Sequence, residues 1–120
     1  MLFLFAIQQP EQLSKKVRKL LEDPDVPRLI SVVSLWEIAV KVQIGKLEAP
    51  DDAAFYQEHI RALNAETLAM GVRHSAGLFK LPMLHTDPFD RLLIAQAREE
   101  DLTLVTRDKD IKRYEVKTIW

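Results

Sequence analysis

The chain has 120 residues, no cysteine and a net charge of −1 from 17 basic and 18 acidic side chains. This length suits a single domain over residues 1–120. The lack of cysteine excludes disulfides and thiolate metal sites. Because the net charge is near zero, the overall charge gives no support to a nucleic-acid partner. Residues 1–7 are apolar but lack the flanks of a signal peptide and are too short to span a bilayer, so we expect a cytoplasmic protein with no membrane partner.

Short apolar strands alternate with helices along the whole sequence. In the first half of the chain we expect a helix at 11–23, a strand at 29–33, a helix at 34–44 and a further helix that begins at 50–52. In the second half we expect a strand at 67–70, helices at 72–80 and 87–97, a strand at 102–106, a short turn or helix at 108–113 and a strand at 116–120. This alternation predicts an α/β fold with a mostly parallel sheet that is covered on both faces.

Acidic residues collect at one edge of this predicted sheet. Glu37 and Asp90 lie in the first turns of two predicted helices, and Asp108 follows the strand at 102–106. In parallel α/β units the carboxyl ends of strands and the amino ends of helices share one edge, where ligands bind. Converging carboxylates repel each other, and a divalent cation such as Mg²⁺ usually compensates. Such a site can hydrolyse a phosphodiester bond.

Each of these carboxylates also has a purely structural interpretation. Ser34 and Glu37 have the spacing of a capping box. Asp87 fits a helix N-cap before Pro88, with Asp90 as an acid in the first turn. Asp108 could shape a turn. No single acid therefore indicates a site. The convergence of the three acids at one edge does.

Three segments resemble conserved blocks of VapC-like PIN-domain nucleases. They are residues 31–41 with the Gly45-Lys46-Leu47 that follows, residues 85–97, and residues 104–108. The resemblance implies a three-layer α/β/α PIN-like fold with a parallel sheet. It also implies a metal-dependent endoribonuclease that uses Mg²⁺ or Mn²⁺, cleaves RNA, pairs with a cognate antitoxin and forms a homodimer.

The same resemblance assigns roles to individual positions. It implies that Glu37, Asp90 and Asp108 are catalytic and bind the metal, and that Thr106, Asp87 and Arg91 support them. Arg107 and Lys109 flank Asp108 and could hold substrate phosphates, or belong to a solvated surface of mixed charge. His85 could assist a leaving group or be an incidental loop residue.

The sequence departs from the family at its start. PIN domains begin with a strand that ends in an aspartate, and residues 2–6 match the apolar helix that follows this strand. We therefore expect the first strand and its aspartate to be missing and residues 1–7 to form a helix. No acidic residue precedes Glu11. A late start, a removed segment and a genuine loss all remain open. Phe3 and Phe5 could contact a dimer partner or an antitoxin, or belong to the core.

Three functions follow from these observations. The first is a metal-dependent ribonuclease, whose cleavage should be weak because one acidic ligand is absent. The second is a catalytically impaired PIN-like remnant that binds an antitoxin or RNA without cutting. The third is a Mg²⁺-dependent receiver-type module, which also gathers carboxylates at a sheet edge but which no other segment of the chain resembles.

Overall fold

The computed structural model describes residues 2–7 and 12–120. The elements, in chain order, are β1 (Phe3–Phe5), α1 (Lys15–Glu22), β2 (Arg28–Ser31), α2 (Val32–Gln43), α3 (Ala53–Ala62), β3 (Glu66–Leu68), α4 (Val72–Gly77), the 3₁₀ helix η2 (Leu78–Lys80), α5 (Pro88–Glu99), β4 (Thr103–Val105), the 3₁₀ helix η3 (Ile111–Arg113) and β5 (Thr118–Ile119). The predicted alternation of helices and strands is confirmed. The start of the helix expected at 11–23 falls partly outside the described residues.

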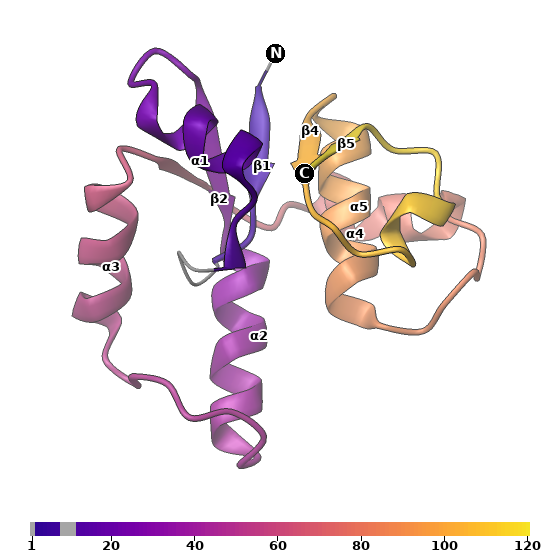
Figure 1. Ribbon diagram of the computed structural model, residues 1–120. Helices are drawn as coiled ribbons and strands as arrows, with labels where there is room; N and C mark the ends of the chain where they lie inside the picture. The colour runs from indigo at the N-terminus through magenta and orange to yellow at the C-terminus, as the bar shows by residue number, and fades with distance from the viewer. Residues whose placement is uncertain (1, 8–11) are drawn as a thin grey trace.

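The five strands form one sheet in the order β3-β2-β1-β4-β5, and every neighbouring pair is parallel (Figure 1). β1 is the central strand. Its Leu4 lies level with Leu29 of β2 and with Leu104 of β4. The predicted α/β fold with a parallel sheet is therefore confirmed.

The expected absence of the first strand is wrong, and so is the helix expected at residues 1–7, of which the structure describes residues 2–7. Backbone bonds from Phe3 to the Pro27 carbonyl and from Thr103 to the Leu2 carbonyl tie β1 to both neighbours. An apolar run this short suits a helix or a buried strand equally well when it is read locally. The segment forms a strand because it fills the position between β2 and β4, and a strand in this central position must be apolar on both faces.

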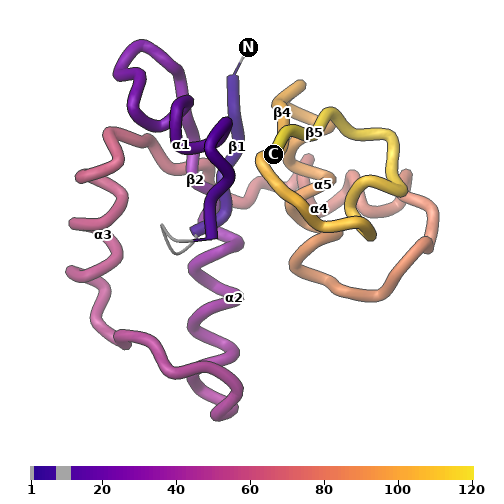
Figure 2. Tube along the Cα trace, in the orientation of Figure 1, coloured from indigo at the N-terminus to yellow at the C-terminus, as the bar shows by residue number. Residues whose placement is uncertain are grey.

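Successive residues of a strand face opposite sides of the sheet. In the tube trace of Figure 2, α3 and α5 lie on opposite sides of β1 and β2. Leu4 and Leu104 pack in the cluster that contains the buried side of α5. Phe5 and Val105 pack in the other cluster, with residues of α1 and α3. This arrangement confirms the three-layer α/β/α architecture. It also buries Phe3 and Phe5, so neither side chain is available to contact a dimer partner or an antitoxin.

The start of α2 differs from the prediction. Ser31 is the N-cap of α2 and accepts a hydrogen bond from the Val33 backbone, so the strand expected at 29–33 ends two residues early. Ser34 lies inside the helix and is buried, donating to the Ser31 carbonyl. The capping box of Ser34 and Glu37 is therefore wrong, and Glu37 lies in the second turn of α2.

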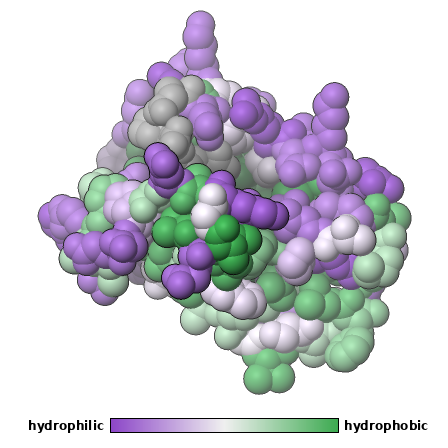
Figure 3. Space-filling view, turned by 90° about the horizontal axis from the view of Figure 1, so that it is seen from below, coloured by the Kyte–Doolittle hydropathy of each residue, from purple (hydrophilic) through white to green (hydrophobic). Residues whose placement is uncertain are grey.

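On the face seen in Figure 3, hydrophobic side chains gather in the lower part of the view and in a smaller group near its centre, while hydrophilic side chains cover most of the upper part. Within residues 2–7 and 12–120, no helix is both long and apolar enough to cross a membrane.

Candidate active site

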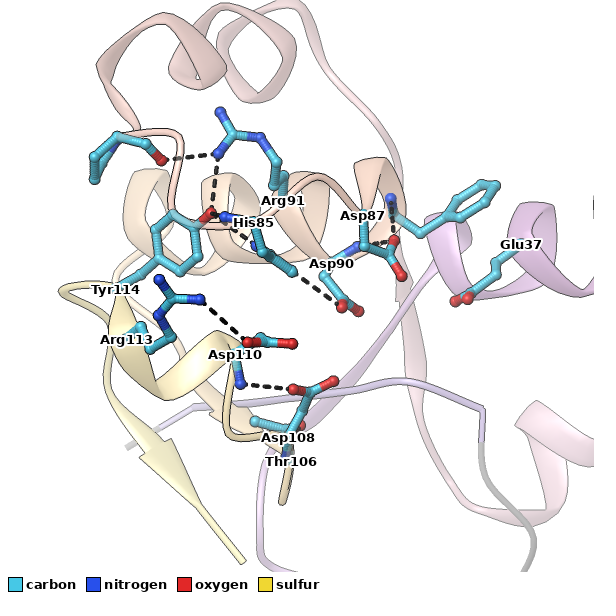
Figure 4. A network of polar contacts seen from close by, with 12 residues as sticks. Glu37, His85, Asp87, Asp90, Arg91, Thr106, Asp108, Asp110, Arg113 and Tyr114 are labelled. Atoms are coloured by element: carbon cyan, nitrogen blue, oxygen red, sulfur yellow. Dashed lines mark hydrogen bonds and ion pairs between the residues drawn. The ribbon is translucent and has the colours of Figure 1, made fainter.

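A cavity of about 460 Å³ opens at the carboxyl edge of the sheet. Glu37 reaches it from α2, Asp90 from the first turn of α5, and Asp108 from the loop after β4 (Figure 4). The three acids that the sequence singled out therefore line one space, although they are far apart along the chain. The edge is the one at which parallel α/β sheets bind their ligands.

The end of β1 forms an apolar part of this cavity. Ala6 and Ile7 both line it. Phe5 lies level with Val105 across the β1–β4 pair, which puts Ala6 level with Thr106. The resemblance leads one to expect an aspartate at the end of this strand. The strand is present, but an alanine and an isoleucine follow it.

Asp90 is the acid whose protonation the site perturbs most. The pKa of the Asp90 carboxyl is raised from 3.8 to about 6, mainly by burial and in addition by the charges of Asp87, Asp108 and Glu37. A hydrogen bond with His85 acts in the opposite direction. Carboxylates that repel each other in a half-buried space are typical of cation sites and of active sites.

The first turn of α5 holds Asp90 in place. Asp87 is the N-cap of this helix, and its Oδ1 accepts from the backbone N–H groups of Phe89 and Asp90 at 2.9 and 3.1 Å. Pro88 occupies the first helical position. The predicted helix start is therefore confirmed in its details. Asp87 contributes charge to the site, but one of its oxygens is committed to capping the helix.

Glu37 has a partner that the sequence analysis did not identify. Its Oε2 accepts from Lys41 Nζ at 2.6 Å, one helical turn further along α2. The hydrogen bond to Glu37 raises the pKa of Lys41, and the charges of Glu37, Asp87 and Asp90 raise it further against the effect of burial. The spacing of four residues was the available signal, because such pairs meet on a helix surface.

Asp108 lies in a tight loop fixed by its own neighbours. The Thr106 hydroxyl accepts from the Asp108 backbone N–H at 3.1 Å, and Asp108 Oδ1 accepts from the Asp110 backbone N–H at 2.8 Å. The turn-forming interpretation of Asp108 is thus correct. It does not compete with a role in the cavity, because the same bonds fix where the carboxylate lies.

The basic residues divide between the cavity and other places. Arg107 lines the cavity, and its guanidinium carbon lies 5.8 Å from the centre of the Trp120 ring. Lys109 is exposed and is not part of the cavity wall. Arg91 is buried and donates from Nη1 to the Pro82 carbonyl at 2.8 Å, facing away from the cavity.

The donor set suits a hydrated cation better than a closed cage. Carboxylate oxygens are hard ligands, and Mg²⁺ binds through one or two of them while it keeps several waters. In the described part of the chain, no three His, Asp or Glu side chains lie close enough together to hold a metal ion. Asp90, Asp108 and Glu37 could therefore hold Mg²⁺ or Mn²⁺ only partly through direct bonds, with water completing the shell.

A second polar network lies behind Asp90, and sequence reasoning missed most of it. Tyr114 is buried, and its hydroxyl lies 2.8 Å from His85 Nδ1 and 3.0 Å from Arg91 Nη1. His85 Nε2 lies 3.3 Å from Asp90 Oδ2. Residues 85 and 114 are 29 positions apart, so no local pattern could have paired them.

These features define an open α/β protein with an acidic cleft at the carboxyl edge of a parallel sheet. The PIN-domain family profile matches residues 3–117, which is nearly the whole chain. The chain therefore belongs to the PIN-domain family, as the resemblance predicted. No curated protein matches it.

Comparison with solved structures agrees on the fold. The chain is similar to one in the crystal structure of VapBC2 from Rickettsia felis bound to a DNA fragment from their promoter. The TM-score is 0.68 at 16% sequence identity, over 99% of this chain and 98% of the other. At this identity the likeness extends to the fold only.

Proposed function

We propose that this protein is a metal-dependent endoribonuclease of a toxin–antitoxin system. The observation that carries the proposal is the convergence of Glu37, Asp90 and Asp108 on one cavity in a PIN-domain fold. Three carboxylates around one space repel each other, and the pKa of Asp90 is raised first by burial and then by the charges of Asp87, Asp108 and Glu37.

Each residue of the cavity has a role in the proposed reaction. Asp90 and Asp108 would hold Mg²⁺ or Mn²⁺, from α5 and from the loop after β4, and Glu37 would contribute from α2. A bound ion supplies positive charge that activates water and meets the negative charge of a phosphodiester in the transition state. Thr106 keeps the loop of Asp108 in shape, and Asp87 fixes the helix turn that carries Asp90. Arg91 supports the site through its hydrogen bonds to the Pro82 carbonyl and the Tyr114 hydroxyl.

Substrate binding falls to the basic side chains at the rim. Arg107 lines the cavity and can pair with a phosphate oxygen, while the exposed Lys109 extends the positive charge along the same loop. Because such contacts release counterions, we expect RNA binding to weaken as salt rises.

We propose a cognate antitoxin and a second copy of the chain as protein partners, acting in the cytoplasm. Membership of the PIN-domain family and the likeness to a chain of VapBC2 support this proposal. The exposed apolar side chains Trp36, Phe79 and Met83 offer surface for such contacts.

The test compares the protein with its Asp90→Asn and Asp108→Asn variants on a labelled single-stranded RNA, with Mg²⁺ and with chelator. We expect metal-dependent cleavage that each variant lowers on the order of 100-fold or more, because the ion loses a ligand. Asp51→Asn, at an exposed position outside the cavity, is the matched control and should cleave like the wild type. Undiminished cleavage by Asp90→Asn would contradict the site assignment.

A second candidate function rests on the end of β1. Ala6 and Ile7 stand where the family resemblance leads one to expect an aspartate, so one acidic ligand is absent. The chain would then be a catalytically impaired PIN-like module that binds its antitoxin or RNA. Saturable RNA binding without cleavage, at any Mg²⁺ or Mn²⁺ concentration, would favour this function over the first.

A further inference from the structure

The hydrogen-bond network behind Asp90 runs through Arg91, Tyr114 and His85 (Figure 4). Its members come from the loop before α5, from α5 itself and from the residue after η3. All are buried or nearly so: Arg91 is 8% and Tyr114 5% exposed, and the His85 side chain is 11% exposed. Buried polar groups at this density are costly unless each donor and acceptor is matched.

Counting donors and acceptors at the Tyr114 hydroxyl determines the direction of the chain of bonds. The backbone N–H of His85 donates to this oxygen at 3.2 Å, and Arg91 Nη1 donates to it at 3.0 Å. A phenol oxygen has two lone pairs and one hydrogen, so both acceptor positions are used. Among the described residues, the partner left for the phenolic hydrogen is His85 Nδ1 at 2.8 Å.

The orientation of the His85 ring follows from this count. Because Nδ1 accepts from Tyr114, the imidazole carries its hydrogen on Nε2. That hydrogen is directed at Asp90 Oδ2, 3.3 Å away. Among the described residues, His85 is the one whose side chain donates a hydrogen bond to the Asp90 carboxylate. The network therefore ends in one N–H donor aimed at the acid at the centre of the cavity.

We infer that His85 and Tyr114 are positioning residues for Asp90: Tyr114 selects the Nε2–H tautomer of His85, and His85 holds the Asp90 carboxylate in place for the metal. The inference rests on the proposed function for its metal. In this arrangement the ring hydrogen of His85 is directed at Asp90 and serves to position the carboxylate. Partners of this kind behind metal ligands typically change metal affinity or activity by about 10- to 100-fold.

Arg91 holds Tyr114 in place, and the neighbouring acids explain why the Asp90 carboxylate needs a fixed donor. Arg91 holds the Tyr114 hydroxyl while its Nη1 also binds the Pro82 carbonyl, which ties the loop before α5 to the residue after η3. The Arg91 guanidinium carbon also lies 5.9 Å from the centre of the Tyr114 ring. Asp90 itself faces the charges of Asp87, Asp108 and Glu37, which push its carboxylate away from the cluster. A fixed donor opposes that push.

Nitrogen NMR of the histidine side chains tests the tautomer without metal or RNA. We expect the Nε2–H form of His85 in the wild type and a mixture of the two tautomers in Tyr114→Phe, which lacks only the hydroxyl. A wild-type ring with its hydrogen on Nδ1 would overturn the inference, whether or not the protein is a nuclease.

Binding of Mn²⁺ to the RNA-free protein, followed by the paramagnetic resonance of the free ion, tests the positioning. Tyr114→Phe should bind Mn²⁺ about 10- to 100-fold more weakly than the wild type. Tyr56→Phe is the matched control, because Tyr56 is also buried and its hydroxyl donates to the Pro50 carbonyl at 2.6 Å. It should bind Mn²⁺ like the wild type. Equal affinity of all three proteins would overturn the positioning role.

Substitutions of His85 separate its two ring nitrogens. Glutamine puts an amide near Nε2 and should keep much of the Mn²⁺ affinity, whereas asparagine reaches only the Nδ1 position and should lose it as alanine does. Equal losses in all three variants would overturn the role of the Nε2–H donor. A wild type that shows the Nε2–H tautomer but binds no Mn²⁺ would contradict the proposed nuclease and, with it, the positioning of a metal ligand.

Discussion

The two walls of the cavity are built in different ways. On the α5–β4 wall, Asp90 and Asp108 are held by a helix cap, a tight loop and the bonds of His85 and Thr106. On the β1–α2 wall, Ala6 and Ile7 present apolar surface, and the carboxylate of Glu37 is paired with Lys41. One wall therefore concentrates negative charge, and the other supplies little.

This difference indicates where a cation would be held. Its strongest attraction comes from Asp90 and Asp108, which carry charge and have fixed positions. The β1–α2 wall adds space and a carboxylate that is already paired. A divalent ion that keeps several waters tolerates such an uneven site, but fewer direct carboxylates should weaken its binding. Three substitutions test this comparison, and the largest effect is expected where the apolar wall gains a charge.

Ala6→Asp should strengthen Mn²⁺ binding and RNA cleavage on the order of 100-fold, because it adds a carboxylate level with Thr106. The same change should lower the free energy of unfolding in chelator by about 1–3 kcal/mol, since a charge enters a partly buried place beside other carboxylates. Mn²⁺ titration, cleavage of labelled RNA and urea unfolding measure the three quantities.

The matched control for this substitution is Ala6→Asn, which has the same shape without the charge. It should bind Mn²⁺ no better than the wild type. If Ala6→Asp and Ala6→Asn behave alike, the end of β1 does not contribute to the ion site and the contrast between the walls has no functional meaning.

Asp90→Asn acts on the charged wall and should stabilise the protein when no metal is present. The folded Asp90 carboxyl has a pKa of about 6, above the ordinary 3.8. At pH 7 it is therefore charged in a place that disfavours charge, and this cost disappears as the pH falls through 6 toward 3.8. We expect the asparagine variant to be about 1–2 kcal/mol more stable at pH 7, after allowance for solvent screening.

Urea unfolding in chelator between pH 4 and 7.5 measures this difference. The advantage of the variant should shrink as the pH falls and vanish near the ordinary pKa of 3.8, where both proteins are uncharged at this position. The hydrogen bond from His85 survives in the variant, because the asparagine oxygen can still accept it. A variant less stable than the wild type at pH 7 would show that Asp90 is held in place without electrostatic cost.

The same contrast explains which parts of the molecule the sequence predicted. The α5 start was predictable because Asp87, Pro88 and Asp90 are local helix-start signals, and the structure has them in those roles. The acids of the cavity could be grouped because parallel topology places helix starts and strand ends at one edge.

The predictions that were wrong concern features that depend on contacts between distant segments. The apolar residues 2–6 resemble the helix after the family's first strand, and nothing within seven residues shows that they pair with β2 and β4. The start of α2 shifted because buried Ser31, which bonds to the equally buried Gln96, is the N-cap and ends the strand early. Tyr114 gave no signal, since its role exists only through His85 and Arg91.

Lys41→Met should give the smallest effect, because it changes a partly exposed ion pair on the weaker wall. Lys41 Nζ lies 2.6 Å from Glu37 Oε2, and the methionine keeps the apolar stem while it removes the charge. The Glu37 carboxylate then faces the cavity without its partner, and the net negative charge there increases. Exposed pairs contribute up to about 1 kcal/mol, so we expect Mn²⁺ binding to tighten by about 2- to 5-fold.

The dependence on salt distinguishes this mechanism from a general change in charge. The gain from Lys41→Met should shrink as ionic strength rises, because screening already weakens the pair in the wild type. Lys46→Met, which removes an exposed lysine outside the cavity, should leave Mn²⁺ affinity unchanged. Weaker binding in Lys41→Met would mean that the lysine holds Glu37 in a productive position. The β1–α2 wall would then be organised for the ion after all.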